Sequence, residues 1–201
     1  MSFNTEVGNL ALGHIGVNYE VADLDTEQSR EAKAIRRYYE TCLASVLRDF
    51  PWGFSTKVAD LLLIEEDPNT DWLFSYRYPS DCLLARKILS GVNITTKNDT
   101  IDFKLSRDVG GRLIMTNQED AVLECTMLNT TFSQMPADFK LAFSYALAVL
   151  IAPSLTSGDP FKIRKDCQAM YESEMSKAKA NSANEETIGP LYDSEFERSR
   201  V

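Results

Sequence analysis

Apolar residues recur every three or four positions through the first fifty residues, and this period predicts two helices. The first spans residues 4–15 and is ended by Gly16. The second follows a loop, is capped by Asp25 or Thr26, and stops before Pro51, because proline cannot continue a helix. The first helix is expected to have Asn4 as its N-cap and to bury Val7, Leu10, Ala11 and His14 or Ile15. The second is expected to bury Ala32, Ile35, Tyr39, Cys42, Leu43, Val46, Leu47 and Phe50.

From Trp52 to about Leu128 the helical period gives way to short alternating runs, which are typical of strands. For example, Ile101, Phe103 and Leu105 alternate with polar residues, as in a strand that is buried on one face. The predicted strands are residues 52–64, 72–78, 83–89, 92–96, 100–105, 113–116 and 121–127. The predicted turns are Asp67-Pro68-Asn69, Pro79-Ser80-Asp81, Lys97-Asn98-Asp99, Gly110-Gly111 and Asn117-Gln118-Glu119-Asp120. The pattern predicts an antiparallel β-subdomain inserted between helices.

Helices resume at Pro136. The segment Ala137–Leu155 is apolar nearly all round and should be central to the helical core. Its longest apolar run, Leu141 to Pro153 with a break at Ser144, is shorter than the roughly 20 residues of a membrane span. Ser157-Gly158-Asp159-Pro160 combines a helix stop with a helix start, and the last helix should run to about Ala180. Its expected core contacts are Phe161, Ile163 or Arg164, Cys167, Met170, Tyr171 and Met175.

The last residues, Asn181 to Val201, are polar and acidic with isolated apolar side chains, and they cannot bury enough surface to fold alone. We interpret them as a tail that orders on a partner. The predicted fold is α+β, mainly α: a bundle of about four helices with an inserted antiparallel β-subdomain and an extended C-terminal tail. The expected divisions are residues 1–51 for the N-terminal helices, 52–135 for the β-rich subdomain, 136–181 for the C-terminal helices and 182–201 for the partner-binding tail.

The charge balance narrows the choice of partners. Among 201 residues, 30 are acidic and 21 basic, a formal net charge of −9, and no long lysine or arginine run offsets it. Such a chain does not attract a phosphate backbone, which disfavours sequence-specific DNA binding.

The N-terminal residues lack the basic start and apolar core of a signal peptide. The cysteines Cys42, Cys82, Cys125 and Cys167 form no C-x-x-C pair, so we expect reduced thiols and no zinc site.

Candidate chemistry is sparse. His14 is the only histidine, so any Ser-His-Asp or Cys-His arrangement must use it, but a lone histidine on a short helix is more often structural. Gly110-Gly111 lacks the pattern of a phosphate-binding loop and is interpreted as a hairpin turn. The acidic residues that could hold a hard cation weakly, but are better interpreted as a loop and a solvated turn, are Asp23, Asp25, Glu65, Glu66 and Asp67. We expect a non-enzymatic protein with no catalytic, cofactor-binding or metal site.

Four aromatic residues, Trp72, Phe74, Tyr76 and Tyr78, stand at strict period two, so in a strand they share one face. The favoured interpretation is the core face of a β-sheet. The rival interpretation is a contact between subunits, because aromatic side chains concentrate at the centres of interfaces. The same residues could serve both purposes.

Four short motifs occur in a fixed order along the chain. They are Asn9-x-Ala11-Leu12-x-x-Ile15-Gly16, Phe50-Pro51-Trp52-Gly53-Phe54, Tyr76-x-Tyr78-Pro79-x-Asp81-Cys82-Leu83 and Met135-Pro136-Ala137-Asp138-Phe139. In their order and spacing, over roughly residues 3–180, the chain resembles the tail tubular protein A family, the head-to-tail adaptors of short-tailed bacteriophages. No single motif is chemically diagnostic.

The resemblance implies a ring of about twelve copies joined by head-to-tail contacts. The ring sits between the portal protein and the tail nozzle protein, with tail fibres as a further candidate partner, and genome DNA passes through it without specific binding. The implied location is the tail or neck of the virion, and the host cytoplasm during assembly, with no membrane contact. Adaptors of this kind grip the portal with a C-terminal segment, for which the apolar anchors here would be Ile188, Leu191, Tyr192 and Phe196.

The surfaces that join neighbouring subunits are expected on the exposed flank of residues 27–48 and on the aromatic strand. Three other functions stay open. The chain could be another phage connector, such as a head-completion or tail-terminator protein. It could be a small acidic hydrolase that uses the cluster Glu65, Glu66 and Asp67, or a binding module of the host.

Overall fold

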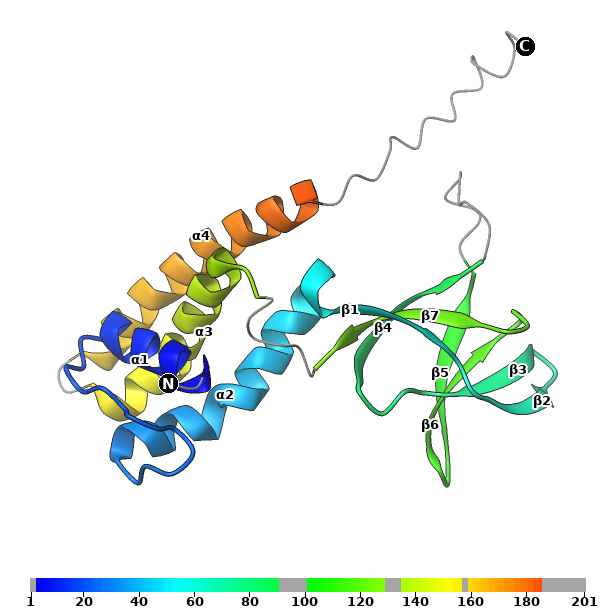
Figure 1. Ribbon diagram of the computed structural model, residues 1–201, viewed down its shortest axis with the longest axis horizontal. Coiled ribbons are helices and arrows are strands. Elements are labelled where there is room, and N and C mark those ends of the chain that lie inside the picture. Colours follow the sequence, from blue (N-terminus) through cyan, green and yellow to red (C-terminus); the bar gives the residue numbers. More distant parts are fainter. Residues whose placement is uncertain (1–2, 91–100, 129–134, 157–158, 186–201) are drawn as a thin grey trace, which may run out of the picture. The chain divides into compact units, whose positions relative to one another are not determined.

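The computed structural model describes residues 3–90, 101–128, 135–156 and 159–185, and their elements confirm an α+β fold (Figure 1). The helices are α1 (Phe3–His14), α2 (Arg30–Asp49), the 3₁₀ turn η1 (Gly53–Ser55), α3 (Ala137–Leu155) and α4 (Pro160–Glu185). The strands are β1 (Thr56–Asp60), β2 (Leu63–Asn69), β3 (Trp72–Arg77), β4 (Cys82–Leu89), β5 (Phe103–Asp108), β6 (Gly111–Thr116) and β7 (Val122–Met127).

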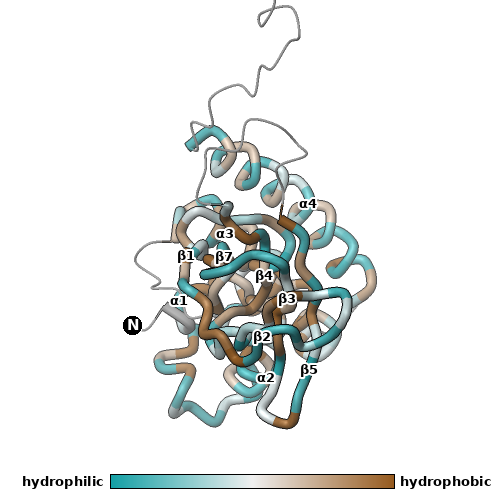
Figure 2. The backbone as a smooth tube through the Cα atoms, turned by 90° about the vertical axis from the view of Figure 1, so that its right-hand side faces the viewer, coloured by the Kyte–Doolittle hydropathy of each residue, from teal (hydrophilic) through white to brown (hydrophobic). Residues whose placement is uncertain are grey.

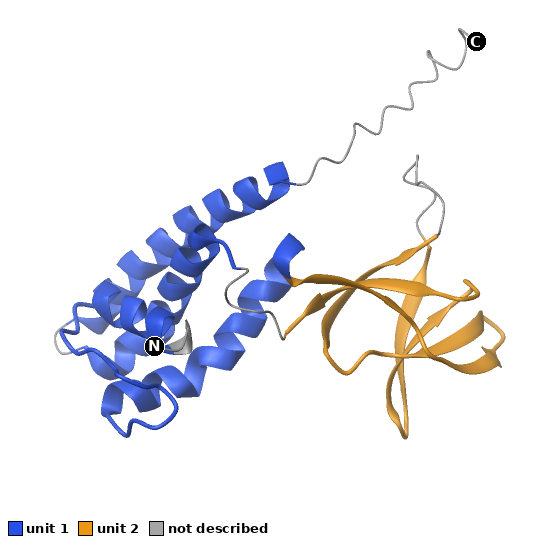
Figure 3. Ribbon diagram, in the orientation of Figure 1, with its two compact units in different colours: residues 1–54, 130–186 blue, residues 55–129, 187–201 orange. Residues whose placement is uncertain are grey.

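The chain divides into two compact units, one helical and one of strands (Figure 3). The division falls between Phe54 and Ser55, shortly after the boundary at residue 51 that the sequence suggests. Because the strands form one continuous stretch, the helical unit is assembled from two segments that are distant in sequence.

α3 is the central helix of its unit, as predicted, and it packs against α1, α2 and α4. By length and composition it is the one helix in the described ranges that is long and apolar enough to cross a membrane, a test that a buried core helix also passes. However, 56% of that stretch is buried inside the protein, including the fully buried Phe139, Phe143 and Leu147. Its apolar character therefore matches that of a core helix.

The two N-terminal helices form as predicted, but their starts differ. α1 begins at Phe3, so Asn4 lies inside its first turn, and Leu10 is exposed rather than buried. α2 begins at Arg30, because Ser29 and not Asp25 or Thr26 is its N-cap: the Ser29 hydroxyl accepts a hydrogen bond from the amide of Ala32. The predicted stripe of α2 is otherwise buried apart from Phe50, which is half-buried.

The residues expected to cap α2 form a separate turn. Asp23 accepts hydrogen bonds from the Asp25 amide and the Thr26 hydroxyl, and Glu27 accepts one from the Ala22 amide. Local bonds of this kind compete with helix formation, which explains why the helix starts later than its acidic residues suggest.

α4 starts where predicted, with the Asp159 carboxylate accepting hydrogen bonds from the amides of Phe161 and Lys162. It runs to Glu185, beyond the predicted end at about Ala180, so the first residues assigned to the tail are helical. Two predicted core contacts are wrong: Phe161 is 78% exposed and Met170 is 43% exposed. The buried line is Cys167, Met175, Ala178 and Ser182, and much of the helix is otherwise hydrophilic (Figure 2).

The strands pair antiparallel in two sheets with the orders β1-β7-β4 and β2-β3-β6-β5. The turn at Pro79-Ser80-Asp81, which connects the two sheets, and the β5–β6 hairpin at Gly110-Gly111 lie where the sequence predicts turns. Asp67-Pro68-Asn69 does not form a turn but ends β2, where Asp67 has a φ of 49° at an irregular register. Pro68 is tolerated because β2 is an edge strand.

The predictions for residues 52–64 and 92–100 also need comment. The expected strand 52–64 is divided into η1, β1 and the start of β2. The expected strand 92–96, the turn 97–99 and residue 100 lie outside the described residues.

The core of the β unit is built from Tyr76, Tyr78, Cys82, Ile88, Ile114, Ala121, Leu123 and Cys125.

Candidate functional site

Two of the four sequence motifs meet within the helical unit, where its two segments pack together. Trp52 is buried with its ring centroid 5.0 Å from that of Phe139, and Phe54 packs 4.8 Å from the same ring. The indole N–H of Trp52 donates to the carbonyl of Val46 at 3.1 Å. Met135 is also buried. These motif residues therefore hold the two ends of the helical unit together by edge-to-face aromatic packing.

The first motif has a comparable structural task. The Asn9 side chain donates to the carbonyl of Val21 and accepts from its amide, both at 2.9 Å, which fastens the loop after α1 to the helix. Ala11, Leu12 and Ile15 are buried, and Gly16 adopts a φ of 75°, a conformation that favours glycine at the end of a helix.

The aromatic strand is a core element first. Tyr76 and Tyr78 are only 2% and 6% exposed, whereas Trp72 and Phe74 are half-buried. The Tyr76 hydroxyl donates to the carbonyl of Gln118 at 2.9 Å. The prediction that this strand joins subunits is untested, and the surface it offers to a partner comes from Trp72 and Phe74.

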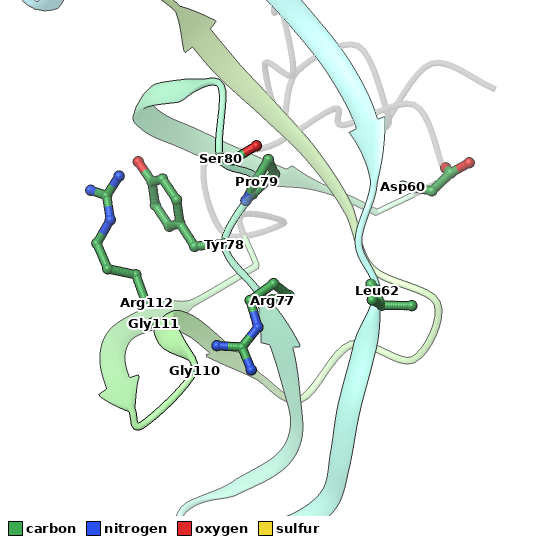
Figure 4. Close-up of a pocket in the computed structure, with 9 residues that line it drawn as sticks. All are labelled: Asp60, Leu62, Arg77, Tyr78, Pro79, Ser80, Gly110, Gly111 and Arg112. Atoms are coloured by element: carbon green, nitrogen blue, oxygen red, sulfur yellow. The ribbon is translucent and has the colours of Figure 1, made fainter.

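A pocket of about 460 Å³ lies in the β unit beside the third motif (Figure 4). Arg77 forms two bonds with the carboxylate of Asp108, at 2.8 and 2.9 Å, across the β5–β6 hairpin. This contact lowers the pKa of Asp108 and raises the pKa of Arg77. A Cβ atom on Gly110 would lie 2.9 Å from the Arg77 guanidinium, so the glycine makes room for the pair.

Arg112 is the second cation that lines this pocket, and its guanidinium donates to the carbonyl of Cys82 at 3.4 Å. Its guanidinium lies 3.8 Å from the centre of the Tyr78 ring, and Figure 4 shows the two side chains side by side. Burial, and then a hydrogen bond with the Cys82 thiol, raise the pKa of Tyr78 to about 12, so its phenol stays protonated at neutral pH. An exposed guanidinium that is held flat on an aromatic ring, with Leu62 and Pro79 nearby, suits a carboxylate attached to an apolar group.

Sequence reasoning missed this pocket. It treated Gly110-Gly111 as a hairpin turn, which is correct, but the flanking Arg112 and the distant Arg77 were not connected to it. The available signal was a double glycine followed at once by arginine, which is too common to indicate a site without the fold.

His14 pairs with a serine, but the pair does not have the arrangement of a catalytic dyad. The Nε2 atom of His14 lies 2.9 Å from the Ser144 hydroxyl, which itself donates to the carbonyl of Leu141 at 2.7 Å. The serine proton is thus engaged, so the histidine must be the donor, and it cannot act as a general base toward Ser144. Ser144 is fully buried, and burial lowers the pKa of His14, whose ring stacks on Tyr145 at 3.7 Å.

The cysteines are buried and free of disulfides. Burial raises the pKa of Cys42 to about 12, and burial together with the neighbouring Cys82 raises that of Cys125 to about 12, which suppresses the nucleophilic thiolate. No group of three or more metal-ligating side chains comes together in the part of the chain that the structure describes. Glu65, Glu66 and Asp67 lie exposed along β2, and Asp23 and Asp25 belong to the turn before α2.

The remaining predicted interface residues divide into two sets. The flank of α2 is exposed at Lys33, Arg37, Glu40 and Arg48. The portal anchors Ile188, Leu191, Tyr192 and Phe196 lie outside the described residues.

Comparison of the chain with models of protein families and with characterised proteins finds no match.

Proposed function

We propose that this protein is a structural component of a bacteriophage virion, a head-to-tail adaptor that forms a ring between portal and tail nozzle. In this proposal the finer arrangement is a helical bundle with an inserted antiparallel β-subdomain and an extended C-terminal tail. The ring gives genome DNA a conduit, and the protein turns over no substrate. About twelve copies would close the ring through head-to-tail contacts.

The observation that carries the proposal is the ordered set of four motifs along almost the whole chain. Each motif has a distinct place in the fold. The first fastens the loop after α1, the second and fourth pack together within the helical unit, and the third borders the Arg112 pocket. Motif residues with separate structural tasks favour a shared fold over a chance match of local sequence. The net charge of −9 also suits a conduit through which DNA must slide.

The test is the mass in solution, by light scattering, of the protein alone and mixed with the portal protein from the same genome. We expect co-migration with the portal at about a dozen copies per portal ring. A chain that lacks residues 186–201 serves as the matched variant, because it removes the four proposed anchors and leaves every described helix and strand intact. It should lose portal binding while its circular dichroism stays unchanged.

Two outcomes would count against the adaptor. If the full chain does not bind the portal, the proposal fails. If it binds the portal only as single copies, a different connector role, such as head completion, is favoured over a ring adaptor.

A further inference from the structure

The two edge strands of the four-stranded sheet differ in character, and the chain just before β5 is bridged to β4 through Ile101 and Ile88. Strands β2 and β5 lie at its two ends, with β3 and β6 between them (Figure 1). Along the β2 edge, three exposed apolar residues are followed directly by three acidic ones: Leu62, Leu63, Ile64, Glu65, Glu66 and Asp67. Along the β5 edge, basic residues flank an exposed leucine and an exposed valine closes the hairpin: Lys104, Leu105, Arg107 and Val109.

We propose that β2 of one copy pairs with β5 of the next copy, so that the sheet continues from subunit to subunit. This inference rests on the proposed ring and specifies the surface that builds it. The contact is head-to-tail, because two different edges of the same sheet meet, and contacts of this type close rings.

The strand directions permit this junction. Every neighbouring pair in the order β2-β3-β6-β5 is antiparallel, so the two edge strands of this even-numbered sheet run in opposite directions. When copies keep their orientation along a ring axis, β5 of the next copy therefore meets β2 in the antiparallel sense. The new ladder has the same geometry as those within the sheet.

One register matches one apolar pair and one oppositely charged pair. If Ile64 lies opposite Leu105, antiparallel pairing places Glu65 opposite Lys104. The faces agree, because Glu65 pairs with Ser75, Ser75 with Met115, and Met115 with Lys104, which puts the two charged side chains on the same face. The irregular register between Leu63 and Glu65 is what brings Glu65 onto that face.

The charged residues of this register are available for a partner. Within the ranges that the structure describes, the side chains of Glu65 and Lys104 make no ion pair or hydrogen bond, and both residues are exposed. Ile64 is 42% exposed and Leu105 is 49% exposed, although free edges of this kind are usually protected against pairing. Pro68 and the bulge at Asp67 protect the end of β2, so the pairing would involve its first half, which carries the other register irregularity, between Leu63 and Glu65.

Charge reversal tests the junction. Glu65→Lys alone and Lys104→Glu alone should each raise the concentration needed for assembly about tenfold, because like charges then face each other. The double variant restores the opposite pair and should assemble like the original chain. Glu66→Lys is the matched control: it makes the same charge change one residue along, on the opposite face, and Lys104→Glu should not rescue it.

Cross-linking gives the direct test. A variant with Glu65→Cys and Lys104→Cys, treated with a short bis-maleimide, should yield a ladder of oligomers, whereas the four native cysteines are buried and should not react. Asp71→Cys combined with Lys104→Cys is the control, because Asp71 lies in the turn beyond β2. This variant should yield no ladder of cross-linked oligomers.

The outcomes separate this interface from the adaptor role. Rings that bind the portal but survive both single charge reversals would overturn the β2–β5 junction and leave the adaptor standing. Dimers from Glu65→Cys alone would overturn it in favour of β2–β2 pairing. Loss of both rings and portal binding in the unmodified chain would refute the adaptor itself, together with the junction that depends on it.

Discussion

At the scale of single residues, His14 shows how hydrogen bonds fix the chemistry of a side chain. The Ser144 hydroxyl gives its proton to the Leu141 carbonyl, so the histidine must carry a proton on Nε2. Tyr145 covers one face of the ring. The side chain thereby joins α1 to α3 and is kept neutral by its burial.

The folded state therefore disfavours protonation of His14, and its pKa is lowered from 6.5 by burial. Because the unfolded chain binds the proton more readily, the contribution of neutral His14 to stability is complete above pH 6.5 and declines as the pH falls through that value. Urea denaturation at a series of pH values from about 7.5 to about 5.5 should show this loss.

His14→Gln is the informative variant, because a glutamine amide can donate to Ser144 and does not titrate. We expect its stability to change less than that of the original chain over this range. The lowered pKa values of Asp23, Glu27 and Asp108 affect stability only at more acidic pH, below their ordinary values. If the stability of the two proteins depends equally on pH, the loss of stability cannot be assigned to His14.

Individual side-chain environments were only partly predictable. The sequence predicts a structural role for a lone histidine on a short helix, because few catalytic arrangements are available to it. Its serine partner lies on α3, 130 positions away in the sequence, and no local pattern indicates that contact. The same holds for the Arg77–Asp108 pair, which the β3–β6–β5 pairing brings together.

At the scale of elements, the hydrophobic period predicted the helices and most strands well, and helix ends poorly. The period reflects burial, which extends over many residues. A helix end depends on a single capping contact, and the segment before α2 offers several candidates. Asp23, Asp25, Thr26 and Ser29 are all good N-caps by residue type, and only the fold assigns the first three to a turn.

The capping assignment makes a direct prediction. Ser29→Ala should lower the free energy of unfolding by about 1 kcal/mol, the usual effect of losing an N-cap hydroxyl. Asp25→Ala is the matched control, because only the backbone amide of Asp25 takes part in the turn, and it should change stability little. Chemical denaturation measures both variants, and a larger effect at Asp25 would refute Ser29 as the cap.

The aromatic cluster around Trp52 in the helical unit provides the second prediction at this scale. Trp52→Ala removes the bond to the Val46 carbonyl and the packing on Phe50 and Phe139, and should destabilise the helical unit by about 3–5 kcal/mol. Leu62→Ala is the control, because Leu62 is 69% exposed. Helical circular dichroism during thermal unfolding reports the difference, and similar midpoints for the two variants would show that the cluster contributes little.

At the scale of the whole molecule, the sequence indicated helices around a β-rich middle but not the order of its strands. β1 pairs with β7 and not with its sequence neighbour, and the strands separate into two sheets. Alternation of side chains determines which face of a strand is buried, but it does not identify the partner strand. The candidate junction between copies follows from this strand order, so the sequence alone did not show it.

The division into units predicts how fragments of the chain behave. All the residues of the β core lie between Tyr76 and Cys125, so a fragment of residues 55–129 carries its complete core. We expect this fragment to unfold cooperatively in urea, with fluorescence from its only tryptophan, Trp72, as the reporter. A fragment of residues 1–54 is the matched comparison. It should stay unfolded, because α1 and α2 bury their apolar faces against α3, which it lacks. A cooperative transition of Trp52 in that fragment would show that α1 and α2 fold without α3. The absence of a cooperative transition for Trp72 in the other fragment would show that the β core depends on the helical unit.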